Sequence, residues 1–97
     1  MIEIKIKPRE VVIKGHAGSD KKGKDLVCCA VSTLYYSLVA NLLVNAKDKS
    51  DIEYDGEDGY ARVKALTFNR ECHRSFKFFK VAVSELEKKY KKYIKIL

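Results

Sequence analysis

The sequence predicts an α+β fold in two layers, β-β-α-β-β-α in order, with a mainly antiparallel sheet and two helices on one face. Three observations support this prediction. Charged and β-branched residues alternate at the amino-terminal end, a second pair of alternating runs follows a long uncharged segment, and two segments carry apolar residues at helical spacing. The 97 residues contain no internal repeat, so we expect residues 1–97 to form one domain.

The first two strands are expected over residues 2–7 and 10–14. Ile2, Ile4 and Ile6 alternate with charged residues, which is the period of a strand with one buried face. Pro8 interrupts the run, and a second apolar run follows at once. The short connection predicts an antiparallel hairpin, which leaves His16 at or just beyond a strand end.

Residues 17–24 are small, polar or charged, and we expect them to form a mobile loop of the kind that commonly carries a site. Ala17, Gly18 and Gly23 belong to this candidate substrate loop. The two glycines serve either as simple turn positions or as hinges for substrate access, and the pattern leaves both interpretations open.

Residues 26–46 carry no charge, and their length raises the question of a transmembrane span. Too many serine, threonine, tyrosine and asparagine side chains interrupt the segment, so we expect a buried helix and no membrane contact. A main apolar stripe should pack on the sheet: Leu26, Ala30, Val31, Leu34, Leu38 and Leu42. A second stripe lies on the opposite side: Cys29, Tyr36, Val39, Ala40 and Leu43. Because so short a chain has few elements to cover it, we predict a homodimer through this second stripe.

Residues 51–66 form two alternating runs around an acidic turn with two glycines, which predicts a second hairpin. The acidic tip superficially resembles a metal loop. It lacks the later glutamate of a calcium-binding loop, and its flanks are strand-like, so we favour a solvated turn. We expect neither a metal nor a cofactor.

The last helix is expected to begin after Asn69, which can cap it. Its apolar face should comprise Cys72, Phe76, Phe79, Val83, Leu86 and Tyr90, widened by Phe78, Ala82 and Tyr93. The opposite side is strongly cationic, which complements the helix dipole and favours a solvated face over an RNA footprint. Residues 93–97 are expected to close as a short edge strand.

The chain carries 20 basic and 13 acidic side chains and a net charge of +7. This charge suits an acidic partner, but the basic residues are spread over every segment, so nucleic acid is at most a secondary partner. Three cysteines, two of them adjacent, form neither a disulfide framework nor a metal-ligand pattern. The amino-terminal residues lack the apolar core of a signal peptide, and we expect a reduced, cytoplasmic protein.

The chemistry is expected within residues 15–32, where His16 and Cys28 lie twelve positions apart. A cysteine nucleophile needs an imidazole that accepts the thiol proton, and helix-start amides favour the resulting anion. A cysteine in an apolar helix often only packs. His16 lies among glycines and charged residues, however, and Cys28 follows a helix start at Asp25, so we favour catalysis and expect a stabilised thiolate.

The neighbouring polar residues have supporting roles in this interpretation. Asp25 either caps the helix or orients His16, and we favour the cap because an anion would oppose formation of the Cys28 thiolate. Ser32 lies one turn after Cys28 and either hydrogen-bonds near the site or is ordinary helix sequence. Cys72 is expected in the core, and His73 on the surface.

These residues resemble the family of ribosomal-processing cysteine proteases of bacteria, known as Prp or YsxB-like proteins. Gly15-His16-Ala17, Gly23, Asp25, Val27-Cys28 and Ser32 occupy the places of the family pattern, with the same separation between histidine and cysteine. Tyr54-Asp55-Gly56 resembles the family's third-strand turn, so the likeness covers most of the chain. Cys29 is a departure, because the family usually has alanine there.

The resemblance implies a cysteine endopeptidase that removes a short N-terminal extension from the precursor of large-subunit ribosomal protein twenty-seven. It also implies a homodimer with a flexible loop over the site, Cys28 as nucleophile and His16 as general base, supported by Asp25 and Ser32. Helix-start amides, including that of Cys28, are expected to bind the oxyanion. Tyr35 and Tyr36 are candidates for lining the substrate pocket. The alternative is a non-catalytic ribosome- or RNA-associated dimeric module.

Overall fold

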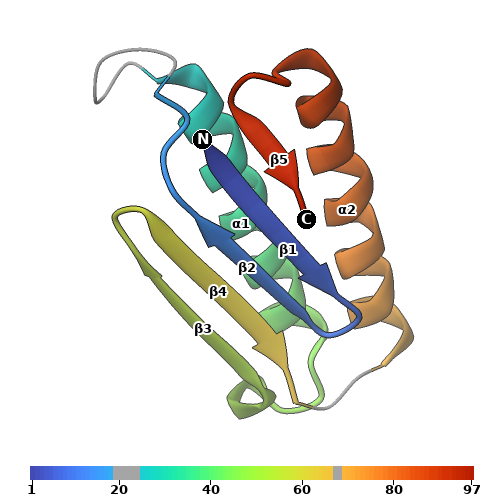
Figure 1. Cartoon of the computed structure of the whole chain (residues 1–97). Coiled ribbons are helices and arrows are strands. Elements are labelled where there is room, and N and C mark those ends of the chain that lie inside the picture. Colours follow the sequence, from blue (N-terminus) through green and yellow to red (C-terminus); the bar gives the residue numbers. More distant parts are fainter. Residues whose placement is uncertain (19–24, 67–68) are drawn as a thin grey trace.

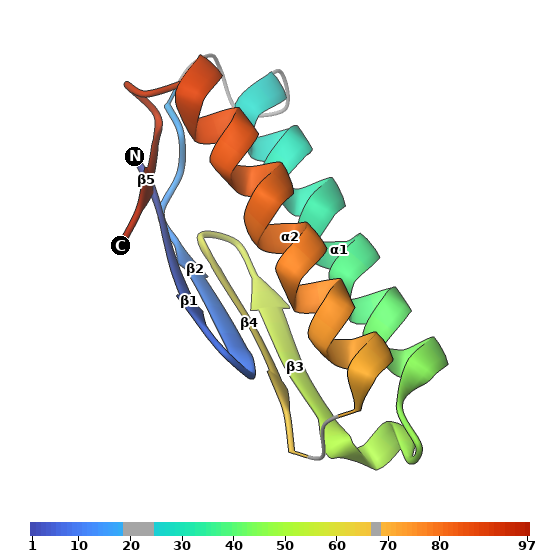
Figure 2. The ribbon, with the colours of Figure 1, turned by 90° about the vertical axis from the view of Figure 1, so that its right-hand side faces the viewer.

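The computed structural model describes residues 1–18, 25–66 and 69–97, so Gly23 of the candidate substrate loop lies outside the described residues. Within them, a five-stranded sheet forms one layer and two long helices cover one of its faces (Figures 1 and 2). The elements are β1 (Ile2–Lys7), β2 (Glu10–Lys14), α1 (Leu26–Asn45), a 3-10 turn (Lys49–Asp51), β3 (Ile52–Glu57), β4 (Tyr60–Ala65), α2 (Arg70–Lys89) and β5 (Ile94–Ile96). The predicted fold class is confirmed.

The strands follow the order β3-β4-β2-β1-β5 across the sheet. Both predicted hairpins are present, and β2 pairs antiparallel with β4. The predicted short strand at the carboxyl end is β5, and it pairs parallel with β1 at the sheet edge (Figure 1). Ile2 and Ile4 are buried whereas Glu3 and Lys5 are exposed, which is the expected period of two.

Helix α1 is long and apolar enough to cross a membrane by length and composition, yet in this structure it is the core helix that packs on the sheet and on α2. Its buried residues are Val27, Val31, Tyr35, Leu38, Val39 and Leu42. The predicted stripe was wrong at Leu26, which is 76% exposed, because the buried face begins one residue later. Val39 is also buried, so it does not belong to the predicted outer stripe. A helix that is apolar on all sides does not reveal its inner face by periodicity alone.

Helix α2 begins as predicted, because the Asn69 side chain accepts the amide of Cys72 at 2.8 Å. Cys72, Phe76, Phe79 and Val83 form its buried face, with Leu86 and Tyr90 partly buried against the core. Phe78 was expected to widen this face, but it is 71% exposed. It lies one residue, about 100° around the helix, before Phe79 and faces the groove between α1 and α2 on the side away from the sheet.

Candidate active site

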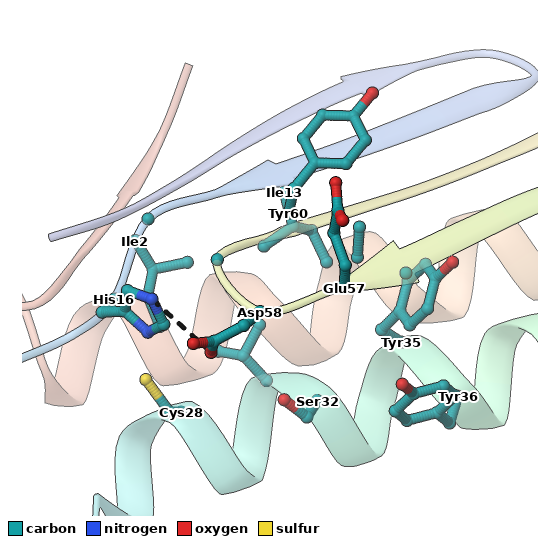
Figure 3. Close-up of a pocket in the computed structure, with 15 residues that line it drawn as sticks. Ile2, Ile13, His16, Cys28, Ser32, Tyr35, Tyr36, Glu57, Asp58 and Tyr60 are labelled. Carbon is teal, nitrogen blue, oxygen red and sulfur yellow. Dashed lines mark ion pairs between the residues drawn. The ribbon is translucent and has the colours of Figure 1, made fainter. Parts of the chain in front are cut away.

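His16 and Cys28 come from separate elements and meet at one cavity of about 370 Å³. His16 follows the end of β2, and Cys28 lies in the first turn of α1. The turn between β3 and β4 forms the third wall. In Figure 3 the Cys28 sulfur and the His16 ring point toward one another, and both residues line the cavity. The fold therefore brings together the two residues that the sequence singled out.

The backbone around His16 is held by two glycines in the left-handed region. Gly15 has φ +95°, its amide donates to the Gly59 carbonyl at 2.9 Å, and a Cβ there would collide with the Met1 carbonyl oxygen. Gly59 has φ +79°, and a Cβ there would lie 3.0 Å from His16 Nε2. Both positions favour glycine for their backbone conformation, and at Gly15 the Met1 backbone also leaves no space for a Cβ. The His16 ring thus rests directly against the β3–β4 turn.

Asp58, at the tip of that turn, lies 3.7 Å from His16 (Oδ1 to Nε2; Figure 3). The sequence predicted this tip only as a solvated turn, and Asp58 is indeed exposed, but the tip also forms part of the site. The reason is strand order: β2 pairs with β4 so that Lys14 is opposite Tyr60. The residues just after Lys14 must then lie beside those just before Tyr60, a neighbourhood that local patterns do not specify.

Cys28 is half-buried, and its sulfur accepts the Ala17 amide at 3.2 Å. Burial raises the pKa of the Cys28 thiol above its ordinary value, the Asp25 carboxylate raises it further, and the Ala17 N–H opposes both. The expectation of a stabilised thiolate at the helix start was therefore wrong for the resting site. Burial removes water that would solvate the Cys28 thiolate. The Asp25 carboxylate also accepts the Val27 and Cys28 amides, which would otherwise have stabilised the thiolate.

Asp25 is the N-cap of α1. Its Oδ1 accepts the amides of Val27 and Cys28, each at 3.0 Å, which confirms the capping interpretation. The Cys28 amide, which was expected to help bind the oxyanion, donates to Asp25 in this structure, and the helix-start oxyanion site stays a prediction. Ser32 is exposed and lines the same cavity as Cys28. Asp25 thus fixes the helix start, and Ser32 presents a hydroxyl to the cavity.

Tyr35 and Tyr36 line the far end of the cavity, as expected (Figure 3). Tyr35 is 2% exposed, and its hydroxyl lies 3.0 Å from the Asp55 carbonyl oxygen and 2.8 Å from that of Arg62, so it ties α1 to β3 and β4. The two rings meet edge to face, with centroids 5.2 Å apart. Outside the cavity lining, Cys29 and His73 are exposed and Cys72 is buried, all in the environments expected of them.

Comparison with known proteins identifies the family. A model of the family described as "Cysteine protease Prp" matches residues 1–95. The "Ribosomal processing cysteine protease Prp" of Staphylococcus aureus strain Mu50 is 25% identical over 91 residues, which cover 93% of this chain and 86% of that protein.

Solved structures show the same fold. The crystal structure of the essential ribosomal processing protease Prp from S. aureus with a covalently linked product peptide superimposes with a TM-score of 0.82, at 22% identity, over 98% of this chain and 94% of that one. The structure of SMU.848 from Streptococcus mutans gives a TM-score of 0.72 at 26% identity, over 98% and 89% of the two chains. Since the family model spans nearly the whole sequence, this chain belongs to the Prp family of ribosomal-processing cysteine proteases.

Proposed function

We propose that this protein removes the short N-terminal extension of the precursor of large-subunit ribosomal protein twenty-seven, with Cys28 as nucleophile and His16 as general base. The observation that carries the proposal is the meeting of these two side chains at one cavity, within a chain of the Prp family. The S. aureus protease of the same fold was crystallised with a substrate peptide and with a covalently linked product peptide.

The reaction begins with a protonated thiol, because burial and Asp25 keep the pKa of Cys28 raised. His16 takes the thiol proton as the sulfur attacks the scissile carbonyl carbon. The new carbon–sulfur bond forms as the carbonyl π electrons move onto oxygen. When the carbonyl re-forms, the carbon–nitrogen bond breaks and His16 gives its proton to the leaving amine. His16 then deprotonates a water molecule, whose oxygen attacks the thioester carbon. The carbon–sulfur bond breaks, the carboxylic acid product leaves, and the imidazolium returns the proton to the Cys28 sulfur.

Asp58 supports this cycle from the side of His16 that faces the hairpin. Once the imidazole carries the thiol proton, the carboxylate 3.7 Å from Nε2 favours its positive charge. Both side chains are more than half exposed in the free protein, so solvent screens the pair. A bound peptide that displaces this water would strengthen the interaction. Asp25 and Ser32 remain supporting residues at the helix start and on the cavity wall.

Substrate recognition is expected to rest on local pockets. A protein of net charge +7 gains nothing from its overall charge when it binds a basic ribosomal protein. The cavity instead offers aromatic surface from Tyr35 and Tyr36, beside the acidic Glu57 and Asp58 of the hairpin (Figure 3). We further propose that the protein acts in the cytoplasm as a homodimer.

The dyad is tested by cleavage of a precursor peptide spanning the extension junction, with wild-type protein, His16→Ala and His73→Ala. We expect His16→Ala to lower kcat/KM by about 10²- to 10⁴-fold, the usual contribution of a general base. His73, exposed on α2, is the matched control, and its replacement should leave the rate unchanged. Cleavage that survives loss of the His16 imidazole would contradict the assignment.

A further inference from the structure

One backbone group at the site has no role in the reaction described so far. The Ala17 N–H donates to the Cys28 sulfur at 3.2 Å, across eleven residues of sequence. We propose that this amide is a donor to the oxyanion that forms when Cys28 attacks a carbonyl. The inference rests on the proposed function only in that Cys28 is the nucleophile.

The amides that usually serve this purpose are already engaged. In the first turn of α1, the N–H groups of Val27 and Cys28 both donate to Asp25 Oδ1 at 3.0 Å. A charge-assisted bond to a carboxylate is about twice as strong as a neutral one, so neither amide is readily released. The Ala17 amide is bonded only to a sulfur atom, which is a weak acceptor while it is a thiol. Among these three amides, it is the one whose hydrogen bond is strengthened most when it turns to an oxyanion.

The position of the amide suits that role. The oxygen of the tetrahedral intermediate is separated from sulfur by one carbon atom, so a donor in contact with the sulfur is within a small displacement of the oxygen. An effective oxyanion donor lies about 2.7–3.1 Å from that oxygen. As the thiolate charge passes to the carbonyl oxygen, the N–H can follow it from sulfur to oxygen.

The surrounding structure also holds the amide in place before the reaction. Ala17 is 5% exposed, and the preceding His16 carbonyl accepts a hydrogen bond from the Met1 nitrogen at 2.5 Å. Gly15 is bonded to Gly59 at 2.9 Å and leaves no room for a Cβ beside the Met1 carbonyl. A donor that is already held beside the nucleophile needs only a small reorganisation when charge develops, which favours efficient electrostatic catalysis.

Replacing one amide by an ester tests the proposal. The chain can be assembled from a peptide thioester of residues 1–27 and a peptide of residues 28–97, because Cys28 supplies the ligation thiol. L-lactic acid in place of Ala17 exchanges only the N–H for oxygen. The matched control carries L-lactic acid in place of Ala46, whose amide donates to the Leu42 carbonyl at 2.8 Å at the far end of α1. All versions carry Cys29→Ala, which leaves Cys28 as the accessible thiol.

Two reagents separate the roles of the amide. Acylation by p-nitrophenyl acetate passes through an oxyanion, whereas alkylation by iodoacetamide does not. The pH dependence of alkylation gives the thiolate fraction, to which both rates are normalised. We expect the position-17 ester to slow acylation per thiolate by about tenfold or more relative to alkylation, and the position-46 ester to leave this ratio unchanged. Equal effects on both reactions, or none, would overturn the proposal.

A second measurement uses the natural backbone and so does not depend on how the ester variant folds. A peptide aldehyde adds to the thiol as a tetrahedral hemithioacetal. We expect the Ala17 amide proton to move downfield and to exchange more slowly with solvent in this adduct, while the Cys28 amide proton changes little. The opposite pattern would assign the oxyanion to the helix start. Cleavage of the precursor peptide by the protein with its natural backbone is measured separately. Failure of the proposed substrate is therefore distinguished from failure of the Ala17 amide as oxyanion donor.

Discussion

At the scale of single residues, the central finding concerns the thiol of Cys28. A thiol at a helix N-terminus is normally more acidic than free cysteine, because the unpaired amides favour its anion. Here Asp25 caps those amides, and burial raises the pKa of Cys28 further. The raised pKa therefore favours the protonated thiol, and in the proposed mechanism His16 activates it. This arrangement limits the reactivity of the thiol when no substrate is bound.

Replacement of Asp25 separates its charge from its capping function. Asp25→Asn removes the negative charge but keeps a carbonyl oxygen for the two amides, so the pKa of Cys28 should fall and the thiolate should appear at lower pH. Asp25→Ala also removes the cap, and we expect it to lower the free energy of unfolding by about 0.5–2 kcal/mol. Iodoacetamide alkylation against pH and urea unfolding measure the two effects. An alkylation profile of Asp25→Asn identical to wild type would contradict the account.

The sequence predicted some of these residues and missed others for a physical reason. His16, Cys28 and the Asp25 cap follow from residue type and spacing along a continuous stretch. Asp58 and Gly59 lie more than forty residues after His16 in the sequence and reach the ring only because β4 pairs with β2. A pattern read along the chain predicted the hairpin, but it could not place the hairpin tip beside the histidine.

At the scale of elements, α1 is the part whose orientation was hardest to predict. Its segment is apolar on every side, so the pattern predicted that the buried face begins at Leu26, whereas it begins at Val27. The tyrosine pair shows why: Tyr35 is buried and Tyr36 is 63% exposed. The Tyr35 ring can be buried because its hydroxyl finds hydrogen-bond acceptors in the backbone carbonyls of β3 and β4. That partnership depends on the tertiary fold and leaves no signal in the helix itself.

The same pair provides a matched test of how α1 is attached to the sheet. Tyr35→Phe removes the hydroxyl that meets Asp55 and Arg62, and we expect the free energy of unfolding to fall by about 1 kcal/mol. Tyr36→Phe changes an exposed ring and should leave stability nearly unchanged. Chemical denaturation measures both variants. Equal stability of the two variants would mean that the Tyr35 hydroxyl does not stabilise this contact.

At the scale of the whole molecule, both hairpins, both helices and the short last strand were predicted, whereas the order of strands in the sheet was not. The parallel pairing of β5 with β1 is a contact between the two ends of the chain. This pairing depends on α2, which packs over the sheet and returns the chain to the end of the sheet where β1 begins (Figure 2). Local periodicity contains no information on such long-range pairing.

The homodimer remains a prediction at this scale, and the structure reduces the part of α1 that is available for the interface. Of the outer stripe of α1, Cys29, Tyr36 and Ala40 are exposed, whereas Val39 is buried. Ala40→Glu would place a charge in the interface, so we expect it to shift the protein toward monomer. Leu97→Glu, at an exposed apolar residue on the open face of the sheet, is the control that should remain dimeric. Light scattering after size exclusion measures the mass, and a wild-type monomer at every concentration would refute the dimer.

The most direct test of the central claim is cleavage of the precursor peptide by wild-type protein, Cys28→Ala and Cys29→Ala, followed by mass spectrometry. Cys28 lines the cavity with His16, whereas its neighbour Cys29 lies outside that lining. We predict a single cut at the extension junction that Cys28→Ala abolishes and Cys29→Ala retains. A cut that persists without Cys28, or no cut by the folded, reduced wild-type protein, would contradict the account.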